Sequence, residues 1–242
     1  MARIGIIGIA GRMGQALVSA IERAGHECAG GADRGDDVGR LADGSDALVD
    51  FSAPGALKSN LHAAIGAGIP ILIGTTGLSD EHHLAIDHAA QAVAVLQTGN
   101  TSLGVTLLAH LVGEAASRLG PDWDIEIVEM HHRMKVDAPS GTAILLGESA
   151  AAARGSHLAA LRESGRDGHT GKRGEGAIGF AALRGGTVTG DHSVIFAGDH
   201  ERVTLSHVAE DRAIFANGAV RGAEWLIGRQ AGRFTMQDVL DL

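Results

Sequence analysis

A glycine-rich turn between an apolar strand and an amphipathic helix restricts the fold of this chain more than any other feature of the sequence. Residues 3–7 are apolar enough for a buried strand, and residues 13–24 place apolar side chains on one helical stripe. Glycines at positions 8, 11 and 14 allow a tight turn, close approach of a ligand to the backbone and close helix packing. Because amide groups at such a helix start bind pyrophosphate, we expect a dinucleotide site over Gly8, Ile9, Ala10, Gly11, Arg12 and Met13.

The same alternation of strand and helix continues through the first hundred residues. Further strands are predicted near residue 32 and over 47–51, 70–74 and 92–96. Ser52 and Pro54 suit the N-cap and first position of a helix that stops at Gly68, and Ser79 caps the next one. Strand–helix repeats of this spacing are typical of a Rossmann-like, doubly wound parallel sheet.

The pattern changes after about residue 103. A helix over 103–119 precedes an alternating strand at 125–129, and another helix follows Pro139. Three later stretches read as strands of a mixed or antiparallel sheet, at 177–183, 188–197 and 202–208. Residues 213–226 return to helical periodicity and are expected to pack on the first domain. The sequence therefore predicts an α/β dinucleotide-binding domain (1–102 with 212–242) and an α+β substrate-binding and oligomerisation domain (103–211).

Composition excludes several classes of protein. The formal net charge of −9 argues against a broad nucleic-acid surface, and no apolar run approaches the roughly 18 residues of a membrane helix. A single cysteine, Cys28, leaves no disulfide framework and no multi-cysteine zinc site, so no metal is expected. Tyrosine is absent, which excludes dehydrogenases built on a Tyr-x-x-x-Lys pair. The start of the chain does not resemble a secretory signal, so a cytoplasmic protein is expected.

Two further segments fit the predicted nucleotide domain. Asp33 lies 19 residues beyond Gly14 at the end of the second strand, where an acid bonds the ribose hydroxyls. The neighbouring Arg34 offers a planar fork to a 2′-phosphate, so the pair suggests a site that accepts both NADH and NADPH. Gly74-Thr75-Thr76-Gly77 follows the fourth strand, at the sheet edge where nucleotides bind in such folds.

Residues 129–143 carry the strongest chemical signal. Pro139 suits a first helical turn, after which the amides of Ser140, Gly141 and Thr142 are expected to form an anion site. Lys135 adds a mobile positive charge, and His131 and His132 can give a proton near neutral pH. An anion site, a cation and a proton donor together predict a reduction site for a carboxylate substrate.

These motifs, taken in order, resemble the dihydrodipicolinate reductase (4-hydroxy-tetrahydrodipicolinate reductase) family along nearly the whole chain. The matching stretches are Gly11-Arg12-Met13-Gly14, Gly74-Thr75-Thr76-Gly77, His131-His132-x-x-Lys135-x-Asp137-Ala138-Pro139-Ser140-Gly141-Thr142-Ala143, Gly168-His169-Thr170-Gly171, Ile178-Gly179-Phe180 and Phe215-Ala216-Asn217-Gly218-Ala219-Val220-Arg221. The resemblance implies an enzyme of lysine and diaminopimelate biosynthesis. Such an enzyme uses NADH or NADPH to reduce a cyclic hydroxylated dicarboxylate, with release of water.

The resemblance also implies roles for individual residues. His131 is the implied proton donor, and Lys135 a second donor or charge stabiliser. The substrate carboxylates are assigned to His132, Lys135, Ser140, Gly141 and Thr142. The turn from Gly8 to Met13 is assigned to the pyrophosphate, Asp33 to the ribose and Arg34 to the NADPH phosphate. The nicotinamide is assigned to Gly74, Thr75, Thr76, Thr98, Gly99, Asn100 and Thr101. The family is tetrameric through its second-domain sheet, so a homotetramer is implied.

The chain departs from the family pattern in three places. Thr101 stands where the family often carries an aromatic residue and Thr106 where an asparagine is familiar, and the segment between Asp33 and Asp46 looks shorter. His192, His200 and His207 are interpreted as surface histidines or satisfied core histidines.

Two alternative functions stay open for the whole chain. One is another nicotinamide oxidoreductase of a small carboxylate, and the other is a nucleotide-sensing protein without turnover.

Overall fold

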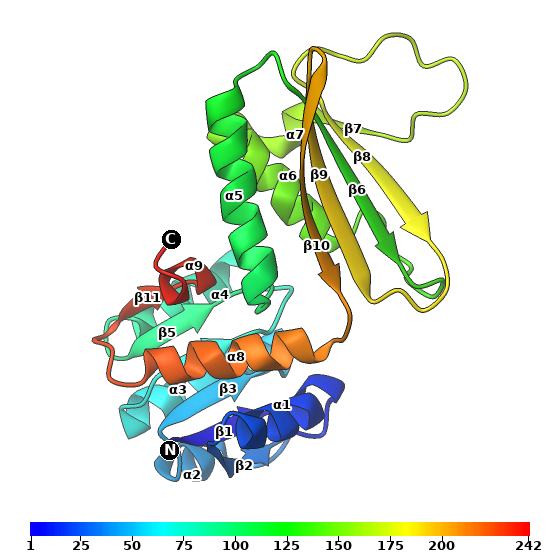
Figure 1. The fold of residues 1–242 in the computed structure, drawn as a ribbon. Helices are drawn as coiled ribbons and strands as arrows, with labels where there is room; N and C mark the ends of the chain where they lie inside the picture. The colour runs from blue at the N-terminus through cyan, green and yellow to red at the C-terminus, as the bar shows by residue number, and fades with distance from the viewer. The chain divides into compact units, whose positions relative to one another are not determined.

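The computed structural model describes residues 1–242, and the chain forms two compact units. Unit 1 comprises Met1–Leu103 and Ala213–Leu242, and unit 2 comprises Gly104–Arg212. Each unit has its own sheet and its own helices (Figure 1). No helix is both long enough and apolar enough to cross a membrane.

Unit 1 is built on a six-stranded parallel sheet. Its strands stand in the order β2-β1-β3-β4-β5-β11. The order reverses between β1 and β3, and nucleotides bind at the carboxyl ends of strands beside such a reversal. The doubly wound parallel sheet is therefore confirmed. The strands are β1 (Arg3–Ile7), β2 (Glu27–Ala32), β3 (Ala47–Asp50), β4 (Ile71–Ile73), β5 (Ala94–Gln97) and β11 (Gly232–Phe234).

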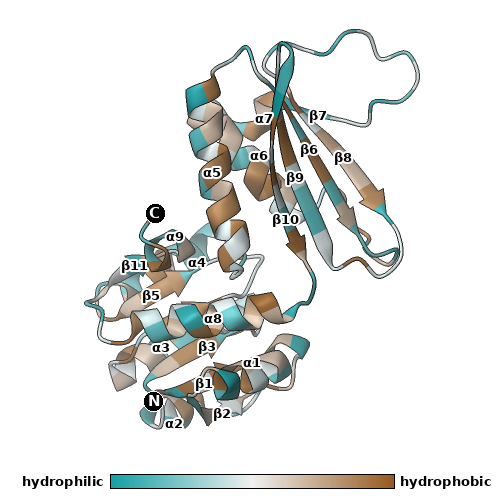
Figure 2. Cartoon of the chain, in the orientation of Figure 1, coloured by the Kyte–Doolittle hydropathy of each residue, from teal (hydrophilic) through white to brown (hydrophobic).

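Helices cover both faces of this sheet, which explains why its four inner strands, β1, β3, β4 and β5, are mostly apolar. Leu72 of β4 packs into one core, whereas Ile71 and Ile73 pack into the other. Figure 2 shows β3 and β5 as mostly hydrophobic segments. One face carries α1 (Arg12–Arg23) and α8 (Ala213–Leu226); the other carries α2 (Val38–Asp43), α3 (Leu57–Ala67) and α4 (Asp80–Ala89). The short α9 (Met236–Val239) packs against α8, and Ala213–Leu242 belongs to unit 1.

Local differences from the predicted elements have local causes. Ser52 is not the N-cap expected of it, because its hydroxyl donates to the buried Asp50 carboxylate at 2.6 Å and a short 3₁₀ helix, η1 (Pro54–Ala56), starts instead after Ala53. Gly68 ends α3 in the left-handed conformation, with φ of 67°. The prediction missed α2, which begins after a side-chain cap from Asp37 within a charged stretch. It also missed β11, a three-residue strand that pairs with β5 and packs Phe234 against Trp225.

Unit 2 contains a five-stranded mixed sheet in the order β10-β9-β6-β8-β7, as predicted. The β6 strand pairs antiparallel with β9 and parallel with β8. The strands are β6 (Asp124–His131), β7 (Arg162–Ser164), β8 (Ile178–Arg184), β9 (Gly190–Gly198) and β10 (Glu201–Ala209). The helices are α5 (Leu103–Leu119), α6 (Gly141–Ala153) and α7 (Leu158–Leu161), and α5 and α6 bury one face of the sheet.

The central position of β6 decides which of its residues are buried. Successive side chains on a strand point to opposite faces, so the odd-numbered positions of β6 face the helices. Ile125 and Ile127 lie in the core, and the same period carries Glu129 and His131 to the buried face, with exposures of 1% and 9%. Two titratable side chains are thus brought together at the carboxyl end of the central strand.

Candidate active site

The buried pair at the end of β6 is the centre of the site in unit 2. Nδ1 of His131 lies 2.6 Å from Oε2 of Glu129. Burial raises the pKa of Glu129, but hydrogen bonds from Arg184 and His131 outweigh that effect and the pKa is lowered overall. The carboxylate is therefore ionised near neutral pH and can only accept, so Nδ1 of His131 carries the proton.

Arg184, from the end of β8, holds the other side of the same carboxylate. Its two terminal nitrogens donate to the two oxygens of Glu129, each at 2.8 Å. The second of them also donates to the carbonyl of Asp137 at 2.7 Å. This planar two-point contact is the strongest geometry for an arginine–carboxylate pair. Arg184 thus joins the buried acid to the loop that carries Lys135.

The start of α6 differs from the expectation in one respect. Pro139 precedes the helix rather than occupying its first turn, and Ser140 is the N-cap, accepting from the amide of Ala143 at 3.2 Å. The amide of Ser140 donates to Glu129 at 3.2 Å, so it is not directed outward to an anion. Gly141 and Thr142 take the first two helical positions, where amides point along the axis away from the helix and favour anions.

A second histidine, His192 of β9, completes the cluster. Its exposure is only 4%, its Nε2 is hydrogen-bonded to the hydroxyl of Ser140 at 2.9 Å, and its ring contacts that of His131 edge-on at 5.1 Å between centroids. Burial and the neighbouring His131 lower the pKa of His192 to about 4, so its ring is neutral at physiological pH. Its Nδ1 has no hydrogen-bond partner.

The remaining predicted substrate residues lie on the loop after β6. Nζ of Lys135 pairs with the Asp137 carboxylate at 2.8 Å, and this contact lowers the pKa of Asp137. Nε2 of His132 accepts a hydrogen bond from Arg212 at 3.1 Å. The positive charge of Lys135 is therefore engaged by an exposed acid of its own loop rather than directed to α6. Surface pairs of this kind are weak, and a ligand carboxylate can replace Asp137.

The glycine turn of unit 1 is tight and lies close against the start of α1. Gly8 has a φ of 87°, which favours glycine, and a Cβ at Gly14 would lie 2.3 Å from the Gly8 carbonyl oxygen. Both positions thus need glycine, one for its backbone angle and one for close packing between the turn and α1. The carboxylate of Asp33 accepts from the amide of Ala10 at 3.1 and 3.3 Å, and Arg34 is exposed beside it.

A cavity of about 190 Å³ lies at the carboxyl ends of β3, β4 and β5. Gly74 admits the Phe51 ring to its wall, since a Cβ at Gly74 would lie 2.3 Å from that ring. Six of the seven residues assigned to the nicotinamide line it, namely Gly74, Thr76, Thr98, Gly99, Asn100 and Thr101, together with Met13, Phe51 and Phe215. A nicotinamide ring is flat and partly apolar, and two aromatic walls with several hydroxyl and amide groups fit it.

Thr75 is the exception in this group. Its hydroxyl lies 3.2 Å from the Asp50 carboxylate and accepts from the amide of Ser52 at 3.1 Å, so its side chain belongs to the buried polar cluster behind the cavity. Thr101, where an aromatic residue is frequent in the family that the sequence resembles, is 2% exposed and donates to the carbonyl of Phe215 at 2.7 Å. The aromatic walls of the cavity are instead Phe51 and Phe215.

Comparisons with known proteins agree with both units. Models described as "Dihydrodipicolinate reductase, N-terminus" and "Dihydrodipicolinate reductase, C-terminus" match residues 2–101 and 104–240. The chain belongs to the dihydrodipicolinate reductase family. A 4-hydroxy-tetrahydrodipicolinate reductase of Zymomonas mobilis subsp. mobilis is 51% identical over 99% of this chain and 97% of its own. One from Rhodopseudomonas palustris (strain HaA2) is 48% identical, with the same coverage of 99% and 97%.

A solved structure has the same fold as this member of the dihydrodipicolinate reductase family. It is a dipicolinate-bound dihydrodipicolinate reductase from Paenisporosarcina sp. TG-14, with a TM-score of 0.78, 21% identity and coverage of 98% of each chain. The resemblance seen in the sequence motifs is thus confirmed, and the chain is an oxidoreductase of lysine and diaminopimelate biosynthesis. Unit 1 is of the type that binds nicotinamide nucleotides.

Sequence reasoning missed three members of the reductase's buried cluster: Glu129, Arg184 and His192. Glu129 was visible as a polar residue at an apolar position of an alternating strand, which is a signal for a buried charge with a partner. Arg184 and His192 gave no such signal, because they join the cluster only through the pairing of β8 and β9 with β6. The interpretation of His192 as an ordinary surface or core histidine overlooked its contacts with Ser140 and His131.

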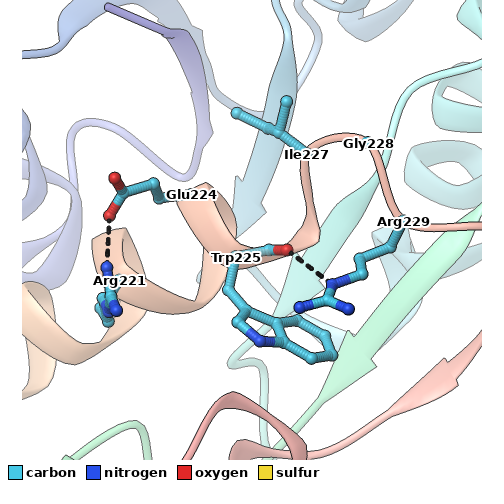
Figure 3. A pocket seen from close by; sticks show the side chains of 6 residues that line it. All are labelled: Arg221, Glu224, Trp225, Ile227, Gly228 and Arg229. Atoms are coloured by element: carbon cyan, nitrogen blue, oxygen red, sulfur yellow. Dashed lines mark hydrogen bonds and ion pairs between the residues drawn. The ribbon is translucent and has the colours of Figure 1, made fainter.

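Two other features of the chain bear on possible further sites. No group of three or more His, Cys, Asp or Glu side chains could hold a metal ion. A pocket of about 400 Å³ at the end of α8 is shown in Figure 3. There Arg221 pairs with Glu224 at 3.1 Å, and Arg229 stacks 4.0 Å from the centre of the Trp225 ring. Both cations of this pocket are engaged within α8 and its end, and none of the predicted site residues lines it.

Proposed function

We propose that this family member uses NADH or NADPH to reduce 4-hydroxy-tetrahydrodipicolinate to tetrahydrodipicolinate. The reaction consumes one hydride and one proton, and the ring hydroxyl leaves as water. When bound, the reduced nicotinamide supplies the hydride. The observation that supports this function most is the buried contact between His131 and Glu129. Glu129 also accepts a hydrogen bond from the amide of Ser140, the N-cap of α6. A proton donor and an anion-binding helix start are thereby tied to one carboxylate.

In this proposal His131 gives the proton and Lys135 is a second donor or a stabiliser of negative charge. The substrate carboxylates are bound by His132, Lys135, the hydroxyl of Ser140 and the amides of Gly141 and Thr142. Lys135 exchanges its exposed partner Asp137 for a substrate carboxylate, which costs little because surface pairs are weak. Positive charge around the ring stabilises the electron-rich species formed as hydride arrives.

The nucleotide is assigned to unit 1. The turn over Gly8, Ile9, Ala10, Gly11, Arg12 and Met13 binds the pyrophosphate. Asp33 keeps acceptor capacity for the ribose hydroxyls beside its bond to the Ala10 amide, since each carboxylate oxygen accepts more than one hydrogen bond. The exposed Arg34 pairs with the 2′-phosphate of NADPH. Thr75 contributes only backbone to the nicotinamide site, whereas Thr98, Gly99, Asn100 and the rest of the cavity lining contact the ring.

We further propose a cytoplasmic homotetramer assembled through the sheet of unit 2. No helix of the unit packs on the face of this sheet opposite α5 and α6, where Arg166 and Arg173 from the loop before β8 bind Glu126. Leu183 and Val208 lie on this face, with exposures of 50% and 63%. Strand pairing places Met130 and Asp191 between them. Apolar side chains grouped on an open sheet face fit a second copy of the same sheet.

The test follows the absorbance of reduced nicotinamide while the preceding synthase generates the substrate in situ. Oxidation that depends on the synthase product supports the reductase, and the rates with NADH and NADPH measure the preference set by Asp33 and Arg34. Binding of NADH without oxidation would favour the nucleotide-sensing alternative. Oxidation with other small carboxylates but not with this product would favour a different oxidoreductase.

A further inference from the structure

The side chain of Glu129 is the most highly connected group of the buried cluster in unit 2. Its carboxylate receives four hydrogen bonds from three separate elements: two from Arg184 on β8, one from the Ser140 amide at α6 and one from His131 on its own strand. Four hydrogen bonds match the roughly four lone-pair sites of a carboxylate. None of the assigned roles includes this residue.

We infer that Glu129, held by Arg184, is a positioning residue that keeps the proton of neutral His131 on Nδ1, so that Nε2 is the atom that exchanges a proton with the substrate. The inference rests on the proposed role of His131 as the proton donor. An ionised carboxylate only accepts, and a 2.6 Å contact therefore fixes one tautomer and one ring orientation. The same carboxylate stabilises the imidazolium form from which the proton is given.

Arg184 makes this arrangement rigid. A carboxylate buried to 1% exposure requires a partner, and the two-point contact with Arg184 supplies it. Arg184 also donates to the carbonyl of Asp137, on the loop that carries Lys135. One guanidinium therefore fixes both this loop and, through Glu129, the His131 ring. The amide of Ser140 extends the same constraint to the start of α6.

The other side of His131 is closed by β9. The neutral His192 ring contacts it edge-on and adds no competing positive charge. Gly190 gives space to the opposite edge of the imidazole, since a Cβ there would lie 2.9 Å from Nε2. The titratable and charged groups around the His131–His192 pair are thus Glu129 on β6, Arg184 on β8, His207 on β10 and Lys135 on the loop after β6.

The main test compares Glu129→Gln with Glu114→Gln, the same chemical change in an exposed arginine pair on α5 of the same unit. Turnover and KM are measured against pH, with thermal unfolding and NADH binding as checks of the fold. For Glu129→Gln we expect kcat to fall by about 10–100-fold and its alkaline limb to move about 1–3 pH units lower, because the imidazolium loses its counter-charge. Glu114→Gln should match the wild type.

If Glu129→Gln lowers kcat but leaves the pH profile unchanged, Glu129 has only a structural role and the inference is overturned. Unchanged kinetics of this variant would overturn it as well. Glu129→Asp retains the charge and should keep the wild-type profile while losing part of kcat. If neither variant folds, the tautomer is read from the wild-type chain by histidine-selective ¹⁵N NMR, with His131→Gln assigning the signals. A neutral His131 protonated at Nε2 would contradict the inference directly.

A second variant probes the other edge of the ring. Gly190→Ala places a methyl group against Nε2 without changing any charge. Since Glu129 prevents the ring from turning away, we expect at least a tenfold loss of kcat with the pH profile retained. Wild-type kcat in this variant would show that the Nε2 edge is not constrained as inferred.

These experiments separate the two levels of the proposal. If His131→Gln keeps wild-type turnover, the proposed proton donor is wrong and the role of Glu129 falls with it. If His131→Gln loses turnover while Glu129→Gln has the wild-type pH profile, the proposed function stands and only the inference about Glu129 fails.

Discussion

The hydroxyl of Ser140 and Nε2 of His192 are hydrogen-bonded at 2.9 Å, although 52 positions separate them in the chain. The contact ties the cap of α6 to the strand β9, and the amide of the same serine binds Glu129 on β6. The start of the helix is therefore fixed against two neighbouring strands of the sheet. The anion site that we propose at this helix start would therefore be preorganised, which lowers the cost of binding a carboxylate.

Replacing His131 with Gln should lower kcat by about 10²–10⁴-fold, the range for loss of a general acid. NADH binding, which the proposal assigns to unit 1, should keep its dissociation constant in a fluorescence titration. A parallel loss of NADH binding and turnover would indicate a structural histidine instead.

Lys135→Ala should raise KM for the substrate and lower kcat together, each by about tenfold or more, because one cation serves both binding and charge stabilisation. Asp137→Asn is the matched control, since it removes the partner of Lys135 but leaves the ammonium group. The control should lower KM or leave it unchanged. Steady-state kinetics that are unchanged in Lys135→Ala would remove this residue from the site.

Gly74→Ala should weaken NADH binding by at least tenfold, because the added methyl group would lie 2.3 Å from the Phe51 ring and force it into the cavity. Gly66→Ala is the control, as nothing lies within 4 Å of its added methyl group inside α3. That change should leave binding intact and stabilise the helix by up to about 1 kcal/mol. Isothermal titration and thermal unfolding measure both effects.

The stability of the protein should fall as the pH drops from about 6.5 to 4. Burial lowers the pKa of His192 from 6.5 to about 4, so in this window the unfolded chain binds a proton that the folded chain does not. Its contribution is fully present above pH 6.5 and amounts to on the order of 2–3 kcal/mol. In urea titrations His192→Asn should flatten this slope. An unchanged slope would assign the acid sensitivity to other groups, such as His207, whose pKa burial also lowers.

Val208→Glu should dissociate the proposed tetramer, because it places a charge on the open face of the unit 2 sheet. Leu84→Glu changes a side chain of similar exposure, 69%, on α4 of unit 1 and should leave the assembly intact. Light scattering coupled to size-exclusion chromatography gives the mass of each. A monomeric wild-type chain, or a tetrameric Val208→Glu, would contradict assembly through this face.

Much of the architecture follows from local patterns. The turn over Gly8–Gly14, the helices Leu103–Leu119 and Ala213–Leu226 and the alternation along β6 all depend on neighbouring residues, so the sequence predicts them directly. The start of α6 was predicted two residues too early, at Pro139 instead of Gly141, and the cap at Ser52 was wrong. In both places a side chain or amide is engaged by a buried carboxylate, Glu129 in one case and Asp50 in the other.

The sequence by itself determined the two kinds of sheet and the family, and it singled out most of the residues that line the cavity of unit 1. Tertiary structure alone decided that Arg184 and His192 join Glu129 and His131, that Thr75 turns away from the cavity, and that Phe51 and Phe215 wall it. The physical reason is that hydrophobic periodicity is a property of adjacent residues. A buried charge, by contrast, needs a hydrogen-bond partner, and that partner can lie far away in the chain. The pairing of the strands decides which side chain is placed beside the charge.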